Sequence, residues 1–223
     1  MSADIQTNVT AVRRRIDAAA ERAGRAARDI TLVAVSKTHD IDAVAAAYAA
    51  GLRDFGENRV QEGTEKIGAA RSRSIDARWH LVGHLQRNKV AAALGCFDIL
   101  HGVDSERLAQ GISDSATEPA RVLIEVNVGG ESSKFGVSPA EASKLAEAIG
   151  RMPHVELLGL MTVAPKADDP EDVRSVFRNL RELRDAIGLR ELSMGMTDDF
   201  EVAIEEGSTL VRVGRAIFGD RVN

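Results

Sequence analysis

The sequence has one cysteine, one tryptophan and one tyrosine, and it lacks any long hydrophobic run. The single cysteine, Cys96, cannot form a disulfide within the chain. No window reaches the roughly 18 apolar residues of a membrane-spanning helix, and the opening MSADIQTNVT has no basic stretch followed by an apolar core. We therefore expect a cytoplasmic protein with no membrane segment.

An excess of positive charge is also missing, since the formal net charge is −5. This balance argues against a broad nucleic-acid-binding or anionic-membrane surface, but it allows a local basic pocket for a small phosphate. Hydrophobic residues make up 44% and charged residues 28%, which is typical of a globular protein. No Pro/Gly/Ser-rich linker divides the chain, so we predict a single domain over residues 1–223.

The spacing of apolar residues changes along the chain. Residues 8–28 have apolar positions three or four apart, which is the spacing of an amphipathic helix. From Ile30 onward, short apolar runs alternate with longer helix-like segments about eight times. The predicted strands are ITLVAVS, RDFGE, RWHLVG, FDILHGV, ARVLIEVNV, VELLGLMTV, RELSM and STLVRVG.

This alternation predicts an α/β protein with a parallel sheet, because strands that are apolar on both faces need helices to cover them. Eight units favour a single (β/α)8 barrel of the TIM type over an open sheet. The GxGxxG fingerprint of open-sheet dinucleotide binders is also missing. The extra N-terminal helix is expected to pack outside the barrel. RELRD and EVAIEEG are interpreted as solvated helix faces.

Polar residues and glycines gather where the predicted strands end, which is where barrels of this type place their chemistry. The candidates are Lys37, Gly56-Glu57-Asn58, Gly83-His84, Asp104, Asn127, Met161-Thr162, Ser193-Met194-Gly195 and Arg212-Val213-Gly214. His80 and His84 are four residues apart, but they lie in a strand and turn, so they need not share a helix face, and no nearby carboxylate completes a metal set. We therefore predict no metal site.

The last two strand ends predict a phosphate site. The loops after strands seven and eight of such barrels often bind phosphate through backbone N–H groups at the start of a short helix. Ser193 would offer its hydroxyl, and Gly214 and Arg215 would offer their backbone amides. The alternative is that the glycines in these segments only permit tight turns.

Lys37 follows the first apolar run. Strand alternation puts Lys37 on the same side as Val33 and Val35, which indicates that it points into the barrel mouth. Desolvation there would lower the pKa of the amine from its usual value near ~10.4 and let it attack a carbonyl group. One interpretation is a lysine that forms a Schiff base and faces the phosphate site across the mouth. The alternative is an exposed lysine at the end of a strand.

Several ungapped blocks together resemble one family, the pyridoxal phosphate homeostasis proteins. They are GENRVQE, WHLVGHLQRNK, SSKFG, GLMTVAP, SMGMTDDFEVAIEEGSTLVRVG and IFG, and with Lys37 they cover nearly the whole chain in order. The resemblance implies a single-domain barrel like the N-terminal domain of bacterial alanine racemase, of the fold type III that binds pyridoxal 5′-phosphate (PLP). It also implies that PLP is held as a Schiff base on Lys37.

By the same resemblance, Ser193 and the amides of Gly214 and Arg215 bind the phosphate of PLP, and Asn58 lines the pocket. Arg212 would lie near either the pyridine nitrogen or the phosphate. If it faces the nitrogen, its fixed positive charge disfavours protonation there, and a neutral pyridine is a poorer sink for carbanion charge. The family commonly has a serine in SMGMS and a threonine after VRxG. This sequence has Thr197 and Arg215 at those positions. Thr197 keeps a hydroxyl, whereas Arg215 has none, so any family role of a threonine hydroxyl at position 215 is in doubt.

The resemblance implies a carrier that buffers PLP or delivers it to apoenzymes, with no catalytic residue assigned. Related racemases use a tyrosine from an additional domain as a second base. The sequence ends at Asn223 after the last predicted strand, and its one tyrosine, Tyr48, lies in a predicted helix, so we expect this base to be absent. Lys134 is a candidate for exchanging the cofactor, or else a surface lysine. The alternative functions are a PLP-dependent amino-acid racemase or related enzyme, and an aldolase that uses Lys37 on a sugar phosphate.

Overall fold

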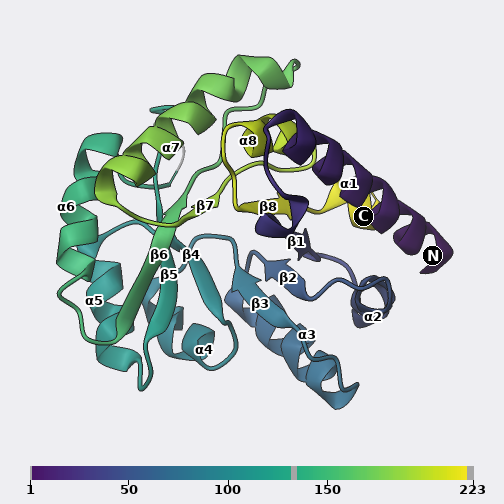
Figure 1. The fold of residues 1–223 in the computed structure, drawn as a ribbon. Helices are drawn as coiled ribbons and strands as arrows, with labels where there is room; N and C mark the ends of the chain where they lie inside the picture. Colours follow the sequence, from purple (N-terminus) through teal and green to yellow (C-terminus); the bar gives the residue numbers. More distant parts are fainter. Residues whose placement is uncertain (1, 132–134, 220–223) are drawn as a thin grey trace.

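Eight parallel strands form a closed barrel in the order β1 to β8 in the computed structural model, which describes residues 2–131 and 135–219 (Figure 1). The strands are β1 (Thr31–Val35), β2 (Asp54–Glu57), β3 (Arg78–Leu81), β4 (Ile99–Val103), β5 (Ala120–Glu125), β6 (Val155–Met161), β7 (Glu191–Ser193) and β8 (Leu210–Val213). The predicted (β/α)8 barrel is confirmed.

Helices surround the barrel on its outside (Figure 1). They are α1 (Ser2–Arg22), α2 (Ile41–Ala49), α3 (Val60–Ser72), α4 (Val90–Leu94), α5 (Glu106–Ser115), α6 (Pro139–Ile149), α7 (Arg174–Ile187), α8 (Phe200–Glu205) and α9 (Arg215–Phe218). Short 3-10 turns lie at Ala27–Asp29, Arg87–Lys89 and Pro170–Val173. Within the part of the chain that the structure describes, no helix is long and apolar enough to cross a membrane.

The side chains of the strands form two separate apolar layers. In β5, Val122 and Ile124 point outward and belong to the large core between the strands and the helices. Between them, Leu123 points inward and packs with Ile99 and Met161 inside the barrel. This follows from the two-residue period of a strand, which sends neighbouring side chains to opposite faces. Polar residues on the inward face are therefore enclosed by the barrel.

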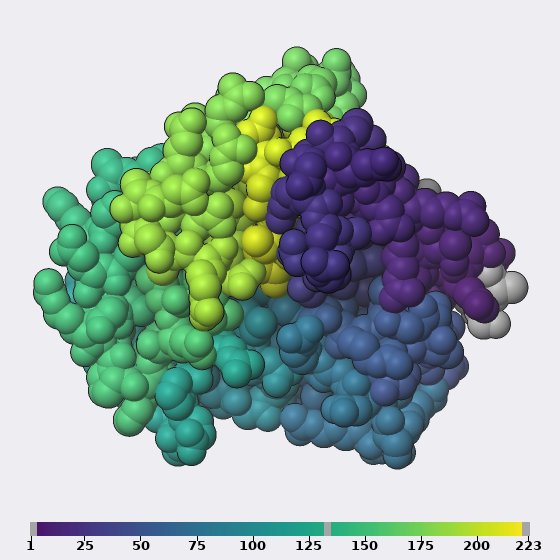
Figure 2. Space-filling model, viewed as in Figure 1, coloured from purple at the N-terminus to yellow at the C-terminus, as the bar shows by residue number. Residues whose placement is uncertain are grey.

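The extra N-terminal helix α1 packs outside the barrel against α2, α8 and α9. Figure 2 shows the first part of the chain, in purple, lying directly against the last part, in yellow. The helix starts before the predicted residue 8 because Ile5 extends the buried stripe of Val9, Val12 and Ile16 by one turn. It ends at Arg22, since Gly24 adopts a left-handed φ of 65° that stops the helix.

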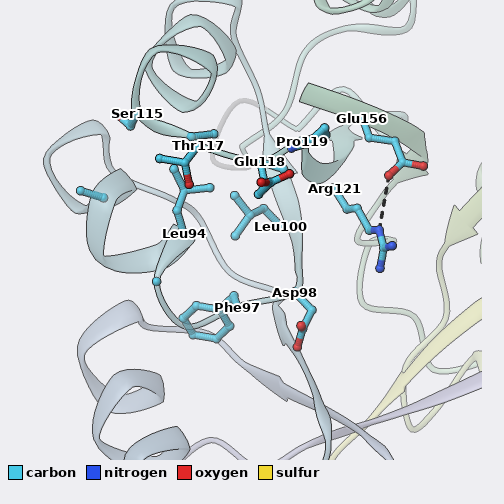
Figure 3. Close-up of a pocket in the computed structure, with 14 residues that line it drawn as sticks. Leu94, Phe97, Asp98, Leu100, Ser115, Thr117, Glu118, Pro119, Arg121 and Glu156 are labelled. Carbon is cyan, nitrogen blue, oxygen red and sulfur yellow. Dashed lines mark hydrogen bonds and ion pairs between the residues drawn. The ribbon is translucent and has the colours of Figure 1, made fainter. Parts of the chain in front are cut away.

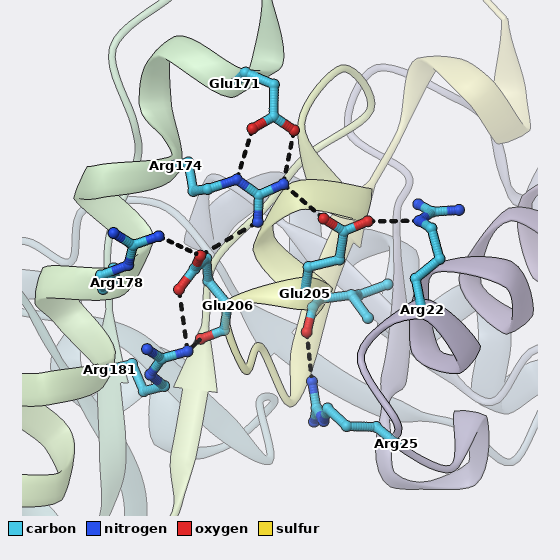
Figure 4. Close-up of polar contacts among 9 residues, drawn as sticks. Arg22, Arg25, Glu171, Arg174, Arg178, Arg181, Glu205 and Glu206 are labelled. Carbon is cyan, nitrogen blue, oxygen red and sulfur yellow. Dashed lines mark hydrogen bonds and ion pairs between the residues drawn. The ribbon is translucent and has the colours of Figure 1, made fainter.

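A network of charged side chains joins α7 to the end of α8 (Figure 4). Arg174, Arg178 and Arg181 project from α7 and contact the Glu206 carboxylate at 3.2, 3.1 and 3.0 Å. Arg174 also contacts Glu205 at 2.6 Å. Glu206 is only 5% exposed, so the interpretation of EVAIEEG as a solvated face is wrong for this residue. The sequence could not show that a second helix brings three guanidinium groups onto it.

Candidate functional site

Lys37 lies at the C-terminal end of the barrel, in the turn that follows β1. Its side chain is half-buried, and Val33 and Val35 before it are buried inside the barrel. Thr38, the next residue, has a left-handed φ of 67°, which is uncommon for a threonine and fixes the path of the turn. Helix α2 begins shortly afterwards at Ile41. The structure therefore places Lys37 at the end of β1 on a constrained segment.

Buried charges lie directly behind this turn. Lys66 of α3 donates to the backbone oxygen of Ser36 at 2.7 Å and to the Glu57 carboxylate at 2.6 Å. The Ser36 hydroxyl donates to the same Glu57 oxygen at 2.7 Å. On the other side of Lys37, Glu62 accepts a hydrogen bond of 2.6 Å from the backbone N–H of Thr38. Both chain neighbours of Lys37 are therefore held by α3 and β2.

The turn after β8 lies beside the Lys37 strand. A Cβ atom added to Gly214 would be 3.1 Å from the backbone oxygen of Val35, and Val213 is paired with Ala34. The expectation that Lys37 faces the phosphate site across the mouth is therefore wrong. The barrel closes by pairing its first strand with its last, so the two segments are neighbours. The close approach also explains the need for glycine at position 214.

The loops after β7 and β8 meet at the mouth. The side chain of Arg215, at the start of α9, contacts Asp198 of the β7 loop at 2.5 Å. Within that loop, the backbone N–H of Met196 donates to Asp199 at 2.5 Å, and Gly195 has a φ of 91°. In α9 the backbone N–H of Ile217 donates to the Gly214 oxygen, so Gly214 and Arg215 stand at the N-terminal end of the helix.

Arg212 is a buried cation next to these loops. Its side chain points into the barrel, where only 4% of the residue is exposed. It donates from Nη1 to the Ser193 hydroxyl at 2.6 Å and from Nη2 to the backbone oxygen of Thr162 at 2.9 Å. Burial lowers the pKa of Arg212 to about 10, and Asp199 and Glu125 oppose that shift. The guanidinium therefore keeps its charge at neutral pH.

Ser193 is fully buried beneath the mouth. Its hydroxyl contacts Arg212 and also the Nδ1 atom of His101 at 2.9 Å. The structure thus places this hydroxyl in a network inside the barrel, and the phosphate-binding role for Ser193 stays a prediction. Thr197, the residue that occupies the last position of SMGMT, is half-buried in the β7 loop.

Asn58 follows β2 and is half-buried at the same end of the barrel. The loop after β3 packs onto its backbone, since a Cβ atom added to Gly83 would lie 2.3 Å from the Asn58 oxygen. The structure thus brings Lys37, Asn58, Arg212 and Gly214 to one end of the barrel. Lys134 lies outside the described residues.

Sequence reasoning missed the acidic residue inside the mouth. Glu125 ends β5, is 8% exposed, and has one carboxylate oxygen, Oε2, with no hydrogen-bond partner among the described residues. Burial and the nearby Asp104 raise the pKa of Glu125 to about 7 against the attraction of Arg212. The signal was present in ARVLIEVNV, where period-two alternation puts Glu125 on the inward face with Leu123.

Each histidine considered for a metal site has one carboxylate partner, which the sequence did not show. His80 contacts Asp54 at 3.0 Å inside the barrel, and His84 contacts Asp104 at 3.3 Å at the mouth. Each carboxylate comes from a different strand end than its histidine, which the local sequence could not show. Among residues 2–131 and 135–219, no three His, Cys, Asp or Glu side chains are grouped to hold a metal ion.

A surface hollow of about 630 Å3 lies at the opposite end of the barrel (Figure 3). Leu94 at the end of α4, Ser115 at the end of α5 and Arg121 at the start of β5 line it. These positions surround the N-terminal ends of the strands. In barrels of this type that face contributes to stability, so the hollow is separate from the candidate site.

The buried groups at the mouth suit a small anionic aldehyde. Lys37, which is half-buried, the Gly214 turn beside its strand and the Arg212 cation offer an amine, backbone donors and a positive charge. The Oε2 atom of Glu125, which has no hydrogen-bond partner among the described residues, adds a polar group at the same end of the barrel.

Comparison with known proteins gives full-length matches. The profile of the family described as "Alanine racemase, N-terminal domain" matches residues 7–222. A protein of Aquifex aeolicus (strain VF5) named "Pyridoxal phosphate homeostasis protein" is 46% identical over 216 residues, which cover 93% of this chain and 94% of the relative. A protein of the same name from Escherichia coli (strain K12) is 43% identical over 98% of this chain and 97% of its own length.

Solved structures share the fold. PipY of Synechococcus elongatus PCC7942, solved with PLP bound, superposes with a TM-score of 0.84 at 31% identity, covering 96% of this chain and 100% of that one. An alanine racemase of Clostridium difficile 630 superposes with a TM-score of 0.75 at 16% identity. That match covers 98% of this chain but 56% of the racemase, and it concerns the fold alone.

Proposed function

The chain belongs to the family of pyridoxal phosphate homeostasis proteins, and from that membership we propose that it binds PLP reversibly and serves intracellular PLP homeostasis. In this role it buffers the cofactor and delivers it to apoenzymes without turning over a substrate. The observation that carries the proposal is the placement of the half-buried Lys37 beside the Gly214 turn, next to the buried cation Arg212.

Each predicted residue has a part in holding the cofactor. PLP supplies an aldehyde that condenses with an amine, and Lys37 provides that amine on a turn held by α3 and β2. The amides of Gly214 and Arg215 would donate to the phosphate, and the Ser193 hydroxyl accepts a hydrogen bond from Arg212 beside them. Arg212 adds a permanent positive charge, which would disfavour protonation of a ring nitrogen placed against it. Asn58 lines the same mouth.

The position of Tyr48 supports a carrier over a racemase. It lies in α2 on the outside of the barrel, where the guanidinium of Arg53 stacks on its ring at 4.0 Å. The only tyrosine of the sequence is therefore occupied away from the mouth. The two curated relatives described above also carry the name of homeostasis proteins. A cytoplasmic location, the recipient apoenzymes and a role of Lys134 stay predictions.

A titration tests the proposal. Purified wild type, Lys37→Ala and the control Lys89→Ala, which alters an exposed lysine of the turn Arg87–Lys89, are titrated with PLP and then reduced with borohydride. We expect a visible absorption band and a reducible adduct, located by mass spectrometry, in wild type and Lys89→Ala. Lys37→Ala should give neither. An undiminished adduct in Lys37→Ala would contradict the assignment of Lys37.

Two further assays separate the functions. Loaded protein is incubated with single-enantiomer amino acids, and a carrier should produce no more of the other enantiomer than free PLP does. Loaded protein is also mixed with a PLP-dependent apoenzyme, whose recovered activity reports delivery. Turnover that depends on Lys37 would favour the racemase alternative. A wild-type protein that takes up no PLP would favour the aldolase alternative.

A further inference from the structure

A continuous row of hydrogen bonds crosses the inside of the barrel from the mouth to the opposite end. It runs from Arg212 Nη1 to Ser193 Oγ at 2.6 Å and from Ser193 Oγ to His101 Nδ1 at 2.9 Å. It continues from His101 Nε2 to His80 Nδ1 at 3.0 Å, and from His80 Nε2 to Asp54 at 3.0 Å. All five residues are at most 7% exposed, so water competes little for these bonds.

The two ends of the row fix the direction of every bond in it. A guanidinium has only donors, so Ser193 accepts from Arg212. An ionised carboxylate has only acceptors, so His80 donates to Asp54 from Nε2. Since each neutral imidazole has one donor and one acceptor, His101 must donate from Nε2 to His80, and Ser193 must donate its hydroxyl proton to His101 Nδ1. With both imidazoles neutral, each is therefore an Nε2–H tautomer.

The charge states of Asp54 and His101 support this assignment. Burial alone would raise the pKa of Asp54, but hydrogen bonds from His80 and Arg78 outweigh it and hold that pKa below its ordinary value. Arg78 contacts Asp54 at 2.9 Å from the rim of the barrel floor, where both residues line a hollow of about 280 Å3. Burial keeps the pKa of His101 well below its ordinary value, so this imidazole is neutral at neutral pH.

A protonated histidine would break the row. If His80 carried a proton on both nitrogens, its Nδ1–H would point at His101 Nε2, and His101 would have to donate from Nδ1 to Ser193 instead. Ser193 would then receive two hydrogen bonds, from His101 and Arg212, and its own proton would lose its acceptor in the row. Burial makes such a loss costly, so every donor and acceptor of the row is paired only when both imidazoles are neutral.

Arg212 needs this support because a competing partner is close. Glu125 and Asp199 both attract it, and the Oε2 atom of Glu125 has no partner in the described part of the chain. The Ser193 and Thr162 bonds hold two of the five guanidinium N–H groups in place. Without the Ser193 hydroxyl, the Arg212 guanidinium could reorient and pair with the Glu125 carboxylate.

We propose that Asp54, His80, His101 and Ser193 are positioning residues that hold Arg212 in the orientation needed at the cofactor end of the barrel. Through them, a carboxylate on the barrel floor controls a cation at the mouth. The link to PLP rests on the proposed function above, whereas the row of hydrogen bonds is a property of the protein without cofactor.

The first test uses cofactor-free protein. The 15N chemical shifts of the imidazole nitrogens, measured at neutral pH with assignment by His80→Gln and His101→Gln, distinguish the two neutral tautomers from the charged form. We expect His80 and His101 both to be neutral with the proton on Nε2, and Ser193→Ala to shift the Nδ1 resonance of His101. An Nδ1–H tautomer or a charged imidazole at either position in the wild type would overturn the proposal, whether or not any variant folds.

The second test measures cofactor binding. PLP dissociation constants and visible absorption spectra are compared for wild type, Ser193→Ala, Ser193→Thr and Asp54→Asn. The matched control is Ser113→Ala, which removes the hydroxyl of a buried serine on α5. Loss of a hydrogen bond to a charged group should weaken binding about tenfold or more in Ser193→Ala and shift the absorption band. Ser193→Thr, which keeps the hydroxyl, should recover most of the loss.

The outcomes of the two tests are distinct. Folded Ser193→Ala and Asp54→Asn proteins that bind PLP with wild-type affinity and spectrum would overturn the positioning role, even with the expected tautomers. A wild type that binds no PLP, but has both Nε2–H tautomers, would contradict the proposed function and leave the hydrogen-bond row established as a feature of the barrel.

Discussion

Replacing Lys66 by methionine is expected to destabilise the protein and to disturb the turn that carries Lys37. The Lys66 side chain is 7% exposed and its ion-pair partner Glu57 is 0% exposed, with 2.6 Å between the charged atoms. The Oε2 atom of Glu57 already has no hydrogen-bond partner among the described residues. After the substitution, the buried carboxylate would keep only the hydroxyl of Ser36 as a donor.

The size of the effect follows from the burial of the pair. Removing one partner of a buried ion pair costs about 3–5 kcal/mol, because the remaining charge is left uncompensated. For a protein of this length, 1 kcal/mol corresponds to about 2–4 °C in melting temperature. We therefore expect Lys66→Met to melt roughly 6–20 °C below wild type. The double variant Lys66→Met with Glu57→Leu should recover much of this loss, since no charge is then left buried.

The same substitution should slow cofactor loading. Lys66 fixes the backbone oxygen of Ser36, and the left-handed φ of Thr38 stores about 1–3 kcal/mol of strain that the surrounding contacts maintain. With Lys66 removed, the turn can relax and move the Lys37 amine. The assays are thermal unfolding followed by circular dichroism and the rate at which the absorption band appears on mixing with PLP. Lys144→Met, an exposed lysine of α6, is the control.

Two results would refute this reasoning. If Lys66→Met has the same melting temperature as the Lys144→Met control, the Glu57 carboxyl is readily protonated or hydrated in its buried position. A double variant no more stable than Lys66→Met would show that the loss comes from packing and not from an uncompensated charge.

The remaining predictions concern Glu125 and Glu206. In the folded protein the pKa of Glu125 is about 7, above its ordinary 4.5. Between pH 4.5 and 7 the Glu125 carboxyl is therefore protonated in the folded state but ionised in the unfolded state. The free energy of unfolding of the cofactor-free protein should therefore fall as pH rises from 4.5 to 7. Glu125→Gln should make this fall smaller by up to about 3 kcal/mol, as measured by urea unfolding at several pH values. An unchanged pH slope in the variant would contradict the raised pKa. Glu206→Gln should cost about 1–2 kcal/mol by thermal unfolding, because the three arginines around it are partly exposed and can be hydrated. An unchanged free energy of unfolding in Glu206→Gln would mean that the network of Glu206 and its three arginines does not stabilise the fold.

The strand pattern was readable because it is local. Short apolar runs separated by helix-like segments predicted the barrel, and period-two alternation predicted that Lys37 continues the inward face of Val33 and Val35. The same rule applied to β5 would have found Glu125. The sequence predicted the N-terminal helix but not where it begins. That start depends on whether the first turn buries a side chain against the barrel, as Ile5 does.

Contacts between different strands were not readable. The row from Arg212 to Asp54 takes its members from β8, β7, β4, β3 and β2, and no spacing in the sequence relates them. The ion pair of Glu57 with Lys66 likewise joins a strand to the helix beside it.

The sequence by itself determined the type and order of the elements and which strand residues face inward, because hydrophobic period and backbone geometry act over a few residues. Only the tertiary structure decided which inward residues touch. Closure pairs β1 with β8, which puts the Gly214 turn beside Val35 instead of opposite Lys37. That adjacency depends on the register and curvature of the whole barrel, and these are set by all eight strands packing together.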